Sequence, residues 1–379
     1  MTLATFAGLA QYDLVGVRED LSDVVSEILL GDKTLLARIG IGGEATNVKH
    51  EWLERSLNAV TVTGAEVMDA SETDLSVSTG HGARTRIGTL LRDIAQGKTE
   101  VMQVTDISTD TLTVARGYGS TSGEAHADAA TYRIIGRPKQ SGEDLSTDRS
   151  TTRTRRDNTC QIFEDAVVIA GDAEAVVKAG VASEVALQSA DRLIELMREL
   201  DQSIIMGIES ASTGSDSVYR SMGGLIEFLT LANGNSVSTA ETLTEEVIND
   251  LYELAFNDGG SPTVLACNQK QAKVISGFNA DKIRIAPGIN MAGQFVSHYM
   301  TDLGQELEIV LDRWIPDDTI MLLDMSRLLV VPLRARGFGM KPIAPTGDAE
   351  KRQLLGDYTM EIRNPLEAHA IHTNLNIPA

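Results

Sequence analysis

The sequence predicts an α+β protein made of several parts, and three stretches of its 379 residues carry this prediction. Residues 66 to 136 are dense in Thr, Ser, Gly and Val, and their short alternating runs are typical of a small all-β module. Residues 181 to 209 have the apolar periodicity of one long helix. Residues 222 to 350 alternate helical and strand-like segments, which indicates a mixed domain.

Composition and charge limit the classes of function. With 42% hydrophobic residues the chain can bury a sizeable core, and its length favours two or three domains. A net charge of -21 disfavours non-specific binding of nucleic acid, which depends on Lys and Arg. This charge would repel nucleic acid close to the protein, or it serves solubility alone; the sequence leaves both open.

Targeting and cysteine signals are sparse. Cys160 and Cys267 lie far apart and predict neither a disulfide framework nor a zinc site. We find no secretory signal pattern and no apolar run of about 18 residues that could cross a bilayer. The expectation is a protein that works in a cytosol, or in a particle assembled there, without a membrane.

Residues 1 to 45 predict an arm that contains a short helix at Glu19 to Leu30. The apolar residues at helical spacing in this segment are Leu21, Val24, Val25, Ile28 and Leu29. A helix this short with a single apolar stripe is not stable alone, so it should dock on the body of the protein or on a neighbouring copy. Leu21, Val25 and Ile28 are therefore candidate contacts between subunits.

Two extended stretches, residues 46 to 65 and 137 to 160, flank the β module. Inside the module, alternating runs at 101 to 107 and 111 to 115 around a polar turn predict a hairpin. Trp52 is a candidate contact at the start of the first stretch. The second stretch holds the basic cluster Arg149, Arg153, Arg155 and Arg156. This cluster could meet acidic residues of a neighbouring subunit, contact DNA, or form a solvated charge run.

The remaining segments predict a helix-and-strand body. The 181 to 209 helix has Ser183 as a plausible cap and would be about 40 Å long. Within 222 to 350 we expect helices at 241 to 257 and 269 to 278. The strands expected in the same body are 161 to 169, 262 to 267, 306 to 311, 320 to 324, 328 to 333 and one or two within 354 to 375.

Motifs that suggest catalysis all have simpler interpretations. Gly97 to Thr99 reads GKT, but a phosphate loop needs Gly where Arg92 stands, so a turn is expected. Ser297, His298 and Asp302 are too close in sequence for a hydrolase triad. His81, His298, His369 and His372 show no metal-ligand spacing. We therefore expect no enzyme activity, catalytic residue, cofactor or metal site.

Several longer segments resemble one family. RRDNTCQIFEDAVVIAG, GVASEVALQ, SMGGLIEFL and GDAEKRQLLGDYTMEIRNPLEAHAIHTNL are similar to the major capsid (major head) proteins of tailed bacteriophages, and VARGYGSTSGEAHADAATYRIIG is similar to a β module of phage head proteins. The order of arm, limb, long helix, mixed domain and return strand is shared with encapsulins. The resemblance covers nearly the whole chain.

The resemblance implies the major capsid fold. It divides the chain into an N-terminal arm (1 to 45), an extended loop (46 to 65 and 137 to 160), the inserted β domain (66 to 136), a peripheral domain (161 to 221 and 351 to 379) with the spine helix, and an axial domain (222 to 350). Some capsids of this fold carry a Lys to Asn cross-link between subunits. Lys49 lies near the limb without matching partners, so no cross-link is expected.

The resemblance also implies the function. Copies of the chain would form hexamers and pentamers of an icosahedral head that encloses double-stranded DNA without specific binding, with a portal at one vertex and possible decoration or minor capsid proteins. The protein would belong to the capsid of the virion, assembled in the host cytoplasm. An encapsulin-like shell around an enzyme cargo is the alternative, and an α/β enzyme is a second one.

Overall fold

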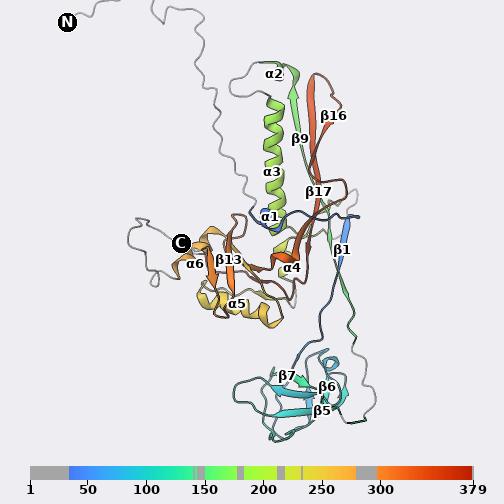
Figure 1. Cartoon of the computed structure of the whole chain (residues 1–379), viewed down its shortest axis with the longest axis vertical. Helices are drawn as coiled ribbons and strands as arrows, with labels where there is room; N and C mark the ends of the chain where they lie inside the picture. The colour runs from blue at the N-terminus through green and yellow to red at the C-terminus, as the bar shows by residue number, and fades with distance from the viewer. Residues whose placement is uncertain are drawn as a thin grey trace, which may run out of the picture. The chain divides into compact units, whose positions relative to one another are not determined.

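The computed structural model describes residues 34–139, 141–142, 150–176, 183–210, 218–231, 234–278 and 297–377. The expected arm helix with Leu21, Val25 and Ile28 lies outside these residues, as does Arg149. The chain divides into two compact units, residues 53–154 and residues 1–52 with 155–379. The chain enters and leaves the first unit through β1 (Lys49–Glu54) and β8 (Thr154–Thr159), which pair as a two-stranded sheet (Figure 1).

The smaller unit is built on one six-stranded sheet in the order β2-β7-β4-β5-β6-β3. Its strands are β2 (Thr61–Thr63), β3 (Asp74–Ser76), β4 (Leu90–Asp93), β5 (Val101–Ser108), β6 (Thr111–Ala115) and β7 (Thr131–Gly136), with a 3-10 turn at Gly82–Arg84. Alternate residues such as Leu91, Met102 and Tyr132 point inward and are fully buried. The expected hairpin is confirmed, since β5 pairs antiparallel with β6.

The two outer strands of this sheet meet each other. Ala65 donates its backbone N–H to the Ser76 carbonyl, Ser78 donates to the Thr63 carbonyl, both at 2.9 Å, and Gly64 bridges Val77. The sheet therefore closes into a small barrel. Because β2 starts at Thr61, the barrel begins before residue 66, where the sequence pattern placed the start of the module. We call residues 61–136 the β module.

In the larger unit, the spine helix α3 (Glu184–Met206) packs on one face of a four-stranded sheet. Its start is confirmed, because the Ser183 side chain accepts a hydrogen bond from the Ala186 amide. Gly207 follows its end. The helix is shorter than the expected 181 to 209, and residues 181 and 182 lie outside the described ones.

The long strand β17 (Ala349–Ile362) is the centre of that sheet. It pairs along one side with β9 (Gln161–Ala170), and along the other side with β16 (Gly339–Ile343) and β15 (Leu328–Pro332). Phe163, Phe338 and Tyr358 form an aromatic cluster on it, with ring centroids 4.7 to 6.5 Å apart. This cluster joins β9 and β17 to the residue that precedes β16.

A second six-stranded sheet has the order β10-β18-β14-β11-β13-β12. Its strands are β10 (Ser236–Val237), β11 (Val264–Cys267), β12 (His298–Met300), β13 (Glu306–Leu311), β14 (Ile320–Leu323) and β18 (Ala370–His372). Helices α5 (Glu245–Asn257) and α6 (Gln269–Gly277) bury Leu251 and Ile275 against one face. The other face packs toward α3, α4 (Leu225–Leu229) and the first sheet in the main core.

The sheets do not follow the expected border between peripheral and axial parts. β15 and β16 were expected in the axial stretch, yet they pair with β17. β18 was expected in the peripheral stretch, yet it pairs with β10 and β14. The alternation of residues predicts a strand but not its partner, so these strands pair across the border expected at residue 350.

Short elements complete the fold. They are α1 (Thr34–Ile39), α2 (Gly171–Ala175) and a 3-10 turn at Met325–Arg327. Helix α5 starts four residues later than expected, because the Thr244 side chain caps it by accepting from the Val247 amide. Among the helices described, none is long and apolar enough to span a membrane.

Candidate assembly surfaces

The last part of the arm is bound to its own chain. Leu35 and Leu36 of α1 are 0% and 5% exposed and belong to the main core. The Leu36 amide donates to Asp201 Oδ1 of α3 at 2.8 Å, and the Leu35 amide donates to Asp312 Oδ2 at 3.2 Å. Two buried carboxylates therefore bind the first amides of α1, which have no partner inside the helix.

The chain then continues along the edge of β15. Ile41 bridges Val330 and Ala45 bridges Leu333, both in parallel. The Gly42 amide donates to the Val330 carbonyl, and Arg334 donates back to Ala45, each at 2.9 Å. Residues 34–45 are thus held within the subunit.

Trp52 is not available as a surface contact. It is 7% exposed and lies in the main core, with its ring 6.2 Å from that of Phe228 and 6.0 Å from that of His50. His50 Nε2 lies 3.1 Å from Glu361 Oε2, and this contact lowers the pKa of Glu361 although burial opposes the shift. The expectation that Trp52 contacts a neighbour is corrected: a large apolar residue in an extended stretch is used here to anchor the limb.

The described arginines of the basic cluster differ in their surroundings. Arg155 is exposed, with its guanidinium 3.4 Å from Glu51 Oε2, while Lys49 pairs with Asp157 at 2.8 Å. Arg156 is half-buried and Arg153 is exposed. Because these pairs are exposed, their contribution to the stability of the subunit is small. Arg153 and Arg155 remain candidates for contacts outside the subunit.

A buried ion group that the sequence did not indicate is centred on strand β17. Asp357 is fully buried on β17 and binds Arg336 through both carboxylate oxygens, at 2.9 and 3.2 Å. Arg220 donates to the same carboxylate at 3.0 Å. These partners are 21 and 137 residues from Asp357, so no local pattern could reveal them.

A second buried ion group lies in the core of the β module. Arg116 donates to both oxygens of Glu100 at 2.7 Å, and the His126 ring lies between Glu100 and Asp93, at 3.1 and 2.7 Å. Burial opposes ionisation of Glu100, but hydrogen bonds from Arg116, from two backbone amides and from His126 lower its pKa to about 2. The remaining Arg116 N–H groups bind the carbonyls of Asp69, Glu72 and Glu124.

The motifs that resembled catalytic sites are not assembled as such. Gly97, at φ 82°, lies in a turn in which the Lys98 amide donates to the Ala95 carbonyl at 3.1 Å. His298 lies 3.2 Å from Glu306, and Asp302 bonds to Asn249 on α5. Burial raises the pKa of Cys160 to about 11 and that of Cys267 to about 12, so both are poor nucleophiles. No cluster of metal-ligating side chains occurs in the part of the chain that the structure describes.

In the part of the chain that the structure describes, apolar side chains of the β9-β17-β16 sheet are exposed on the face opposite α3. α3 packs over Phe163 and Val167, and side chains alternate along a strand, so Ile162 and Val168 point to the opposite face. Val168 pairs with Lys351, and Lys351 with Ile343, which places these three side chains in one row. Ile162, Val168 and Ile343 are 44%, 57% and 43% exposed. We call this surface the open sheet face.

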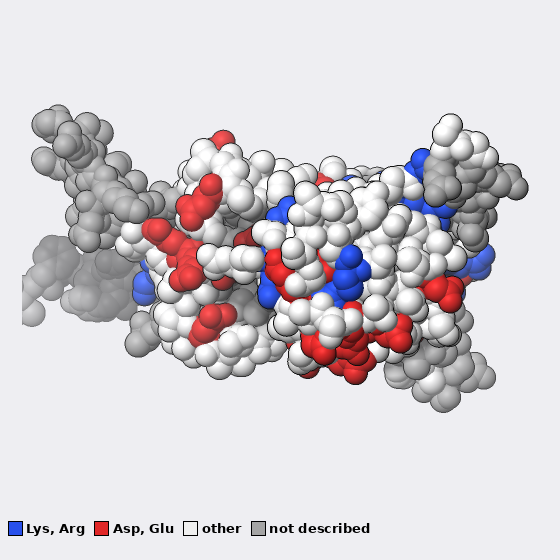
Figure 2. Space-filling view, turned by 90° about the horizontal axis from the view of Figure 1, so that it is seen from below, with Lys and Arg blue, Asp and Glu red and all other residues white. Residues whose placement is uncertain are grey.

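Charge is distributed unevenly on the surface. Acidic side chains are more widespread than basic ones on the face of the molecule seen in Figure 2. The exposed side of α5 contributes Glu245, Glu246, Asp250 and Glu253. Such a surface offers little to a polyanion.

The described residues thus form two sheets beside a spine helix, a limb of two paired strands and a strip of exposed apolar side chains. Solved structures share the fold. A chain from Microbacterium phage Oxtober96 is 14% identical, with a TM-score of 0.53 over 98% of this chain and 100% of that one. A chain from Mycobacterium phage Bobi is 10% identical, with a TM-score of 0.52 over the same shares. The fold is that of phage capsid proteins.

The family follows from the sequence match. The chain belongs to the family described as SU10 major capsid protein, which matches residues 5–376. No curated protein matches the chain. The protein is thus a major capsid protein of a phage and part of the virion capsid.

Proposed function

We propose that copies of this chain form hexamers and pentamers that close into an icosahedral head around double-stranded DNA. Assembly takes place in the host cytoplasm, with a portal at one vertex and with decoration or minor capsid proteins as further partners. The protein acts by forming interfaces and has no catalytic role. Family membership over residues 5–376 supports the shell, and the open sheet face supports a specific contact.

The open sheet face is the observation that carries this proposal. A sheet covered on one side by α3 leaves Ile162, Val168 and Ile343 in water on the other side. Burying an aliphatic side chain of this size contributes roughly 1.5 to 3 kcal/mol. A neighbouring subunit on this face would therefore gain several kcal/mol per contact.

Exposed arginines on the limb support a second contact. Arg153 and Arg155 are in an extended segment, share one face and sit in a protein of net charge -21, so acidic surface on an adjacent copy is abundant. Each ion pair contributes little alone. In a closed shell each subunit is held by several neighbours at once, and weak contacts add up to a stable particle.

The charge also supports the relation to the genome. The shell would enclose DNA without specific binding, because a protein of net charge -21 repels the phosphate backbone. A container of this kind can be filled and emptied without breaking many contacts.

Electron microscopy of Val168→Glu, with Val168→Thr as the matched control, tests both the shell and the contact. Both variants keep a strand residue at an exposed position, but only the glutamate places a charge in the interface. We expect closed shells with wild type and Val168→Thr, and few or none with Val168→Glu. Shells from Val168→Glu at wild-type yield would refute the open sheet face as a contact. Absence of shells from the wild type under all assembly conditions would refute the function itself.

A further inference from the structure

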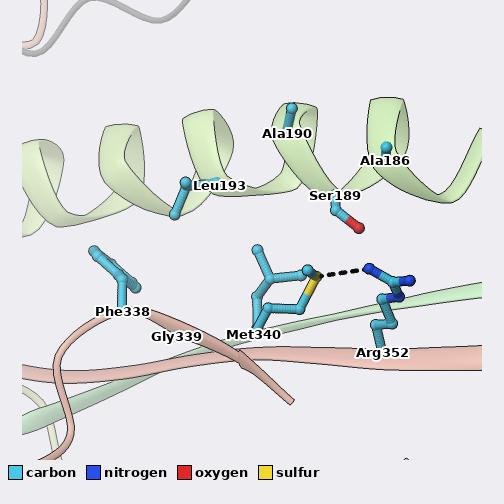
Figure 3. Close-up of a pocket in the computed structure, with 9 residues that line it drawn as sticks. Ala186, Ser189, Ala190, Leu193, Phe338, Gly339, Met340 and Arg352 are labelled. Carbon is cyan, nitrogen blue, oxygen red and sulfur yellow. Dashed lines mark hydrogen bonds between the residues drawn. The ribbon is translucent and has the colours of Figure 1, made fainter. Parts of the chain in front are cut away.

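The apolar surface of the larger unit fits many kinds of partner. A groove of about 340 Å³ runs between the spine helix and the strands beside it (Figure 3). Ala190 and Leu193 line it from α3, and Phe338 and Met340 line it from the sheet side. Charged surface is more selective, because it rejects partners of the same sign. The β module carries two charged surfaces of opposite sign.

Two arginines stand directly opposite each other on the outside of the barrel. Arg92 of β4 pairs in register with Arg133 of β7, and both residues are exposed. Their neighbours Leu91 and Tyr132 point inward, so the arginines point outward. Neither guanidinium forms an ion pair with another residue that the structure describes. Like charges at such a cross-strand position destabilise a sheet, so this basic pair lacks a stabilising partner within the described part of its own chain.

Two aspartates flank one threonine on another part of the barrel. Thr113 of β6 lies opposite Asp74 of β3 on one side and opposite Asp106 of β5 on the other. Leu112 beside it is fully buried, so this row of three side chains points outward. Both aspartates are exposed, and neither is ion-paired to any residue described. Asp74 and Asp106 form an acidic pair.

The basic pair and the acidic pair lie on different sides of the barrel. In the strand order β2-β7-β4-β5-β6-β3, the basic pair is centred between β7 and β4, and the acidic pair is centred on β6. With six strands around a closed barrel, the two centres are roughly 150° apart about its axis. The basic pair therefore points away from the acidic pair of its own module, and only another copy can bring the two together.

The geometry of the two pairs is complementary. The Cβ atoms of Arg92 and Arg133 are neighbours across two strands, at about 5 Å. The two aspartates are separated by two strand spacings, or about 10 Å. Long arginine side chains can diverge over this difference, and the guanidinium fork fits a carboxylate bidentately. Each arginine can thus bind one aspartate.

We propose that the basic pair of one β module binds the acidic pair of the β module of an adjacent copy, so that modules join head to tail around the rings of the shell. The inference rests on the proposed function, because the shell brings copies side by side. A head-to-tail contact repeats from copy to copy until the ring closes. Exposed ion pairs are weak alone, but within a ring the neighbouring module is present at a high effective concentration.

Cysteine cross-linking of particles of the full-length protein tests the contact. Thr61→Cys combined with Thr113→Cys puts one thiol beside each pair and keeps all four charges, because Thr61 lies opposite Arg133. A short bismaleimide should join successive copies and give products of three or more chains on a denaturing gel. The two single variants are the matched controls, since a head-to-tail contact gives them no second thiol nearby. Cys160 and Cys267 are buried and should not react.

The outcomes distinguish the possible arrangements. Products of three or more chains from the double variant, several-fold above either single variant, support the proposal. Monomers alone overturn it, and so does a dimer formed equally well by a single variant, which would mean that like sides meet across a two-fold axis. The reaction is scored on particles that are closed in electron microscopy, so these results leave the shell standing. A wild type that forms no particle would instead refute the shell, and this contact with it.

Exchange of the charges tests whether the ion pairs direct the contact. In the double-cysteine chain, Asp74→Arg with Asp106→Arg makes both sides basic and should lower the yield of multimers on the order of tenfold. Adding Arg92→Asp with Arg133→Asp exchanges the two signs and should restore most of the yield. Loss of closed particles in the first variant counts as the same effect if the exchange restores them. An unchanged yield in the first variant, or no recovery in the second, would overturn the proposal.

Discussion

Replacing Arg116 by Met should destabilise the β module while leaving the rest of the chain folded. The change removes the cation that binds both oxygens of Glu100 and the carbonyls of Asp69, Glu72 and Glu124. The pKa of Glu100 is lowered from 4.5 to about 2, which at 1.36 kcal/mol per unit corresponds to about 3 kcal/mol. Leaving one member of a buried ion group without its partner costs about 3 to 5 kcal/mol in other proteins, which agrees.

Hydrogen exchange of the full-length protein at neutral pH is the assay. Slowly exchanging amides of β5 and β7 report the opening free energy of the module, and those of α3 report the larger unit. We expect the former to lose about 3 to 5 kcal/mol and the latter to change by less than about 0.5 kcal/mol. Arg92→Met, at an exposed position of β4, is the control.

The pH dependence of the wild type provides a second check on the same reasoning. Because the folded-state pKa of Glu100 lies below its ordinary value, its contribution is complete above pH 4.5 and is lost as the pH falls toward about 2. In Arg116→Met this loss should be smaller. A variant whose module exchanges like the wild type at neutral pH would show that the buried ion group does not stabilise the barrel.

Three further changes follow from the packing. Leu200→Ala should lower the free energy of unfolding by about 2 to 5 kcal/mol, measured by urea denaturation, because Leu200 is fully buried in the main core; Glu199→Ala is the control, and equal midpoints would contradict this. Gly356→Ala should cost about 1 to 3 kcal/mol and lower Tm, because the new Cβ would lie 2.6 Å from a Phe338 ring atom; an unchanged Tm would mean that the ring moves freely. Asp201→Ala should speed exchange of the Leu36 amide, at a cost of about 0.5 to 2 kcal/mol, and a protected amide would show that α1 holds without this cap.

Local periodicity predicted the elements that depend on neighbouring residues. The spine helix, its Ser183 cap, the hairpin of β5 and β6 and strand β13 at 306–311 all occur where the sequence places them, within a few residues. Helix α1 was missed, because TLLARI is too short for a helical period to show. β16 was missed as well, since GMKPI contains Gly and Pro and its residues are all exposed.

Features that depend on partners distant in sequence were beyond sequence reasoning. The ion groups around Asp357 and Glu100 join residues between 16 and 137 positions apart, and in a chain with 54 acidic residues no single carboxylate is conspicuous. The candidate contacts show the same limit. Trp52 was predicted to contact a neighbouring subunit because it is a large residue in an extended stretch. Its ring instead packs beside Phe228 of α4, and this packing depends on a residue far away in the sequence.

The closed barrel of the β module has a consequence for how the chain can be altered. Its first and last strands, β2 and β7, are hydrogen-bonded neighbours, with Thr61 opposite Arg133. The two ends of the module are therefore adjacent in space. Its hydrophobic residues form a separate cluster of their own. An autonomous fold whose ends are adjacent can be exchanged for another of similar end spacing, which makes this position a natural point for grafting foreign sequences onto the particle.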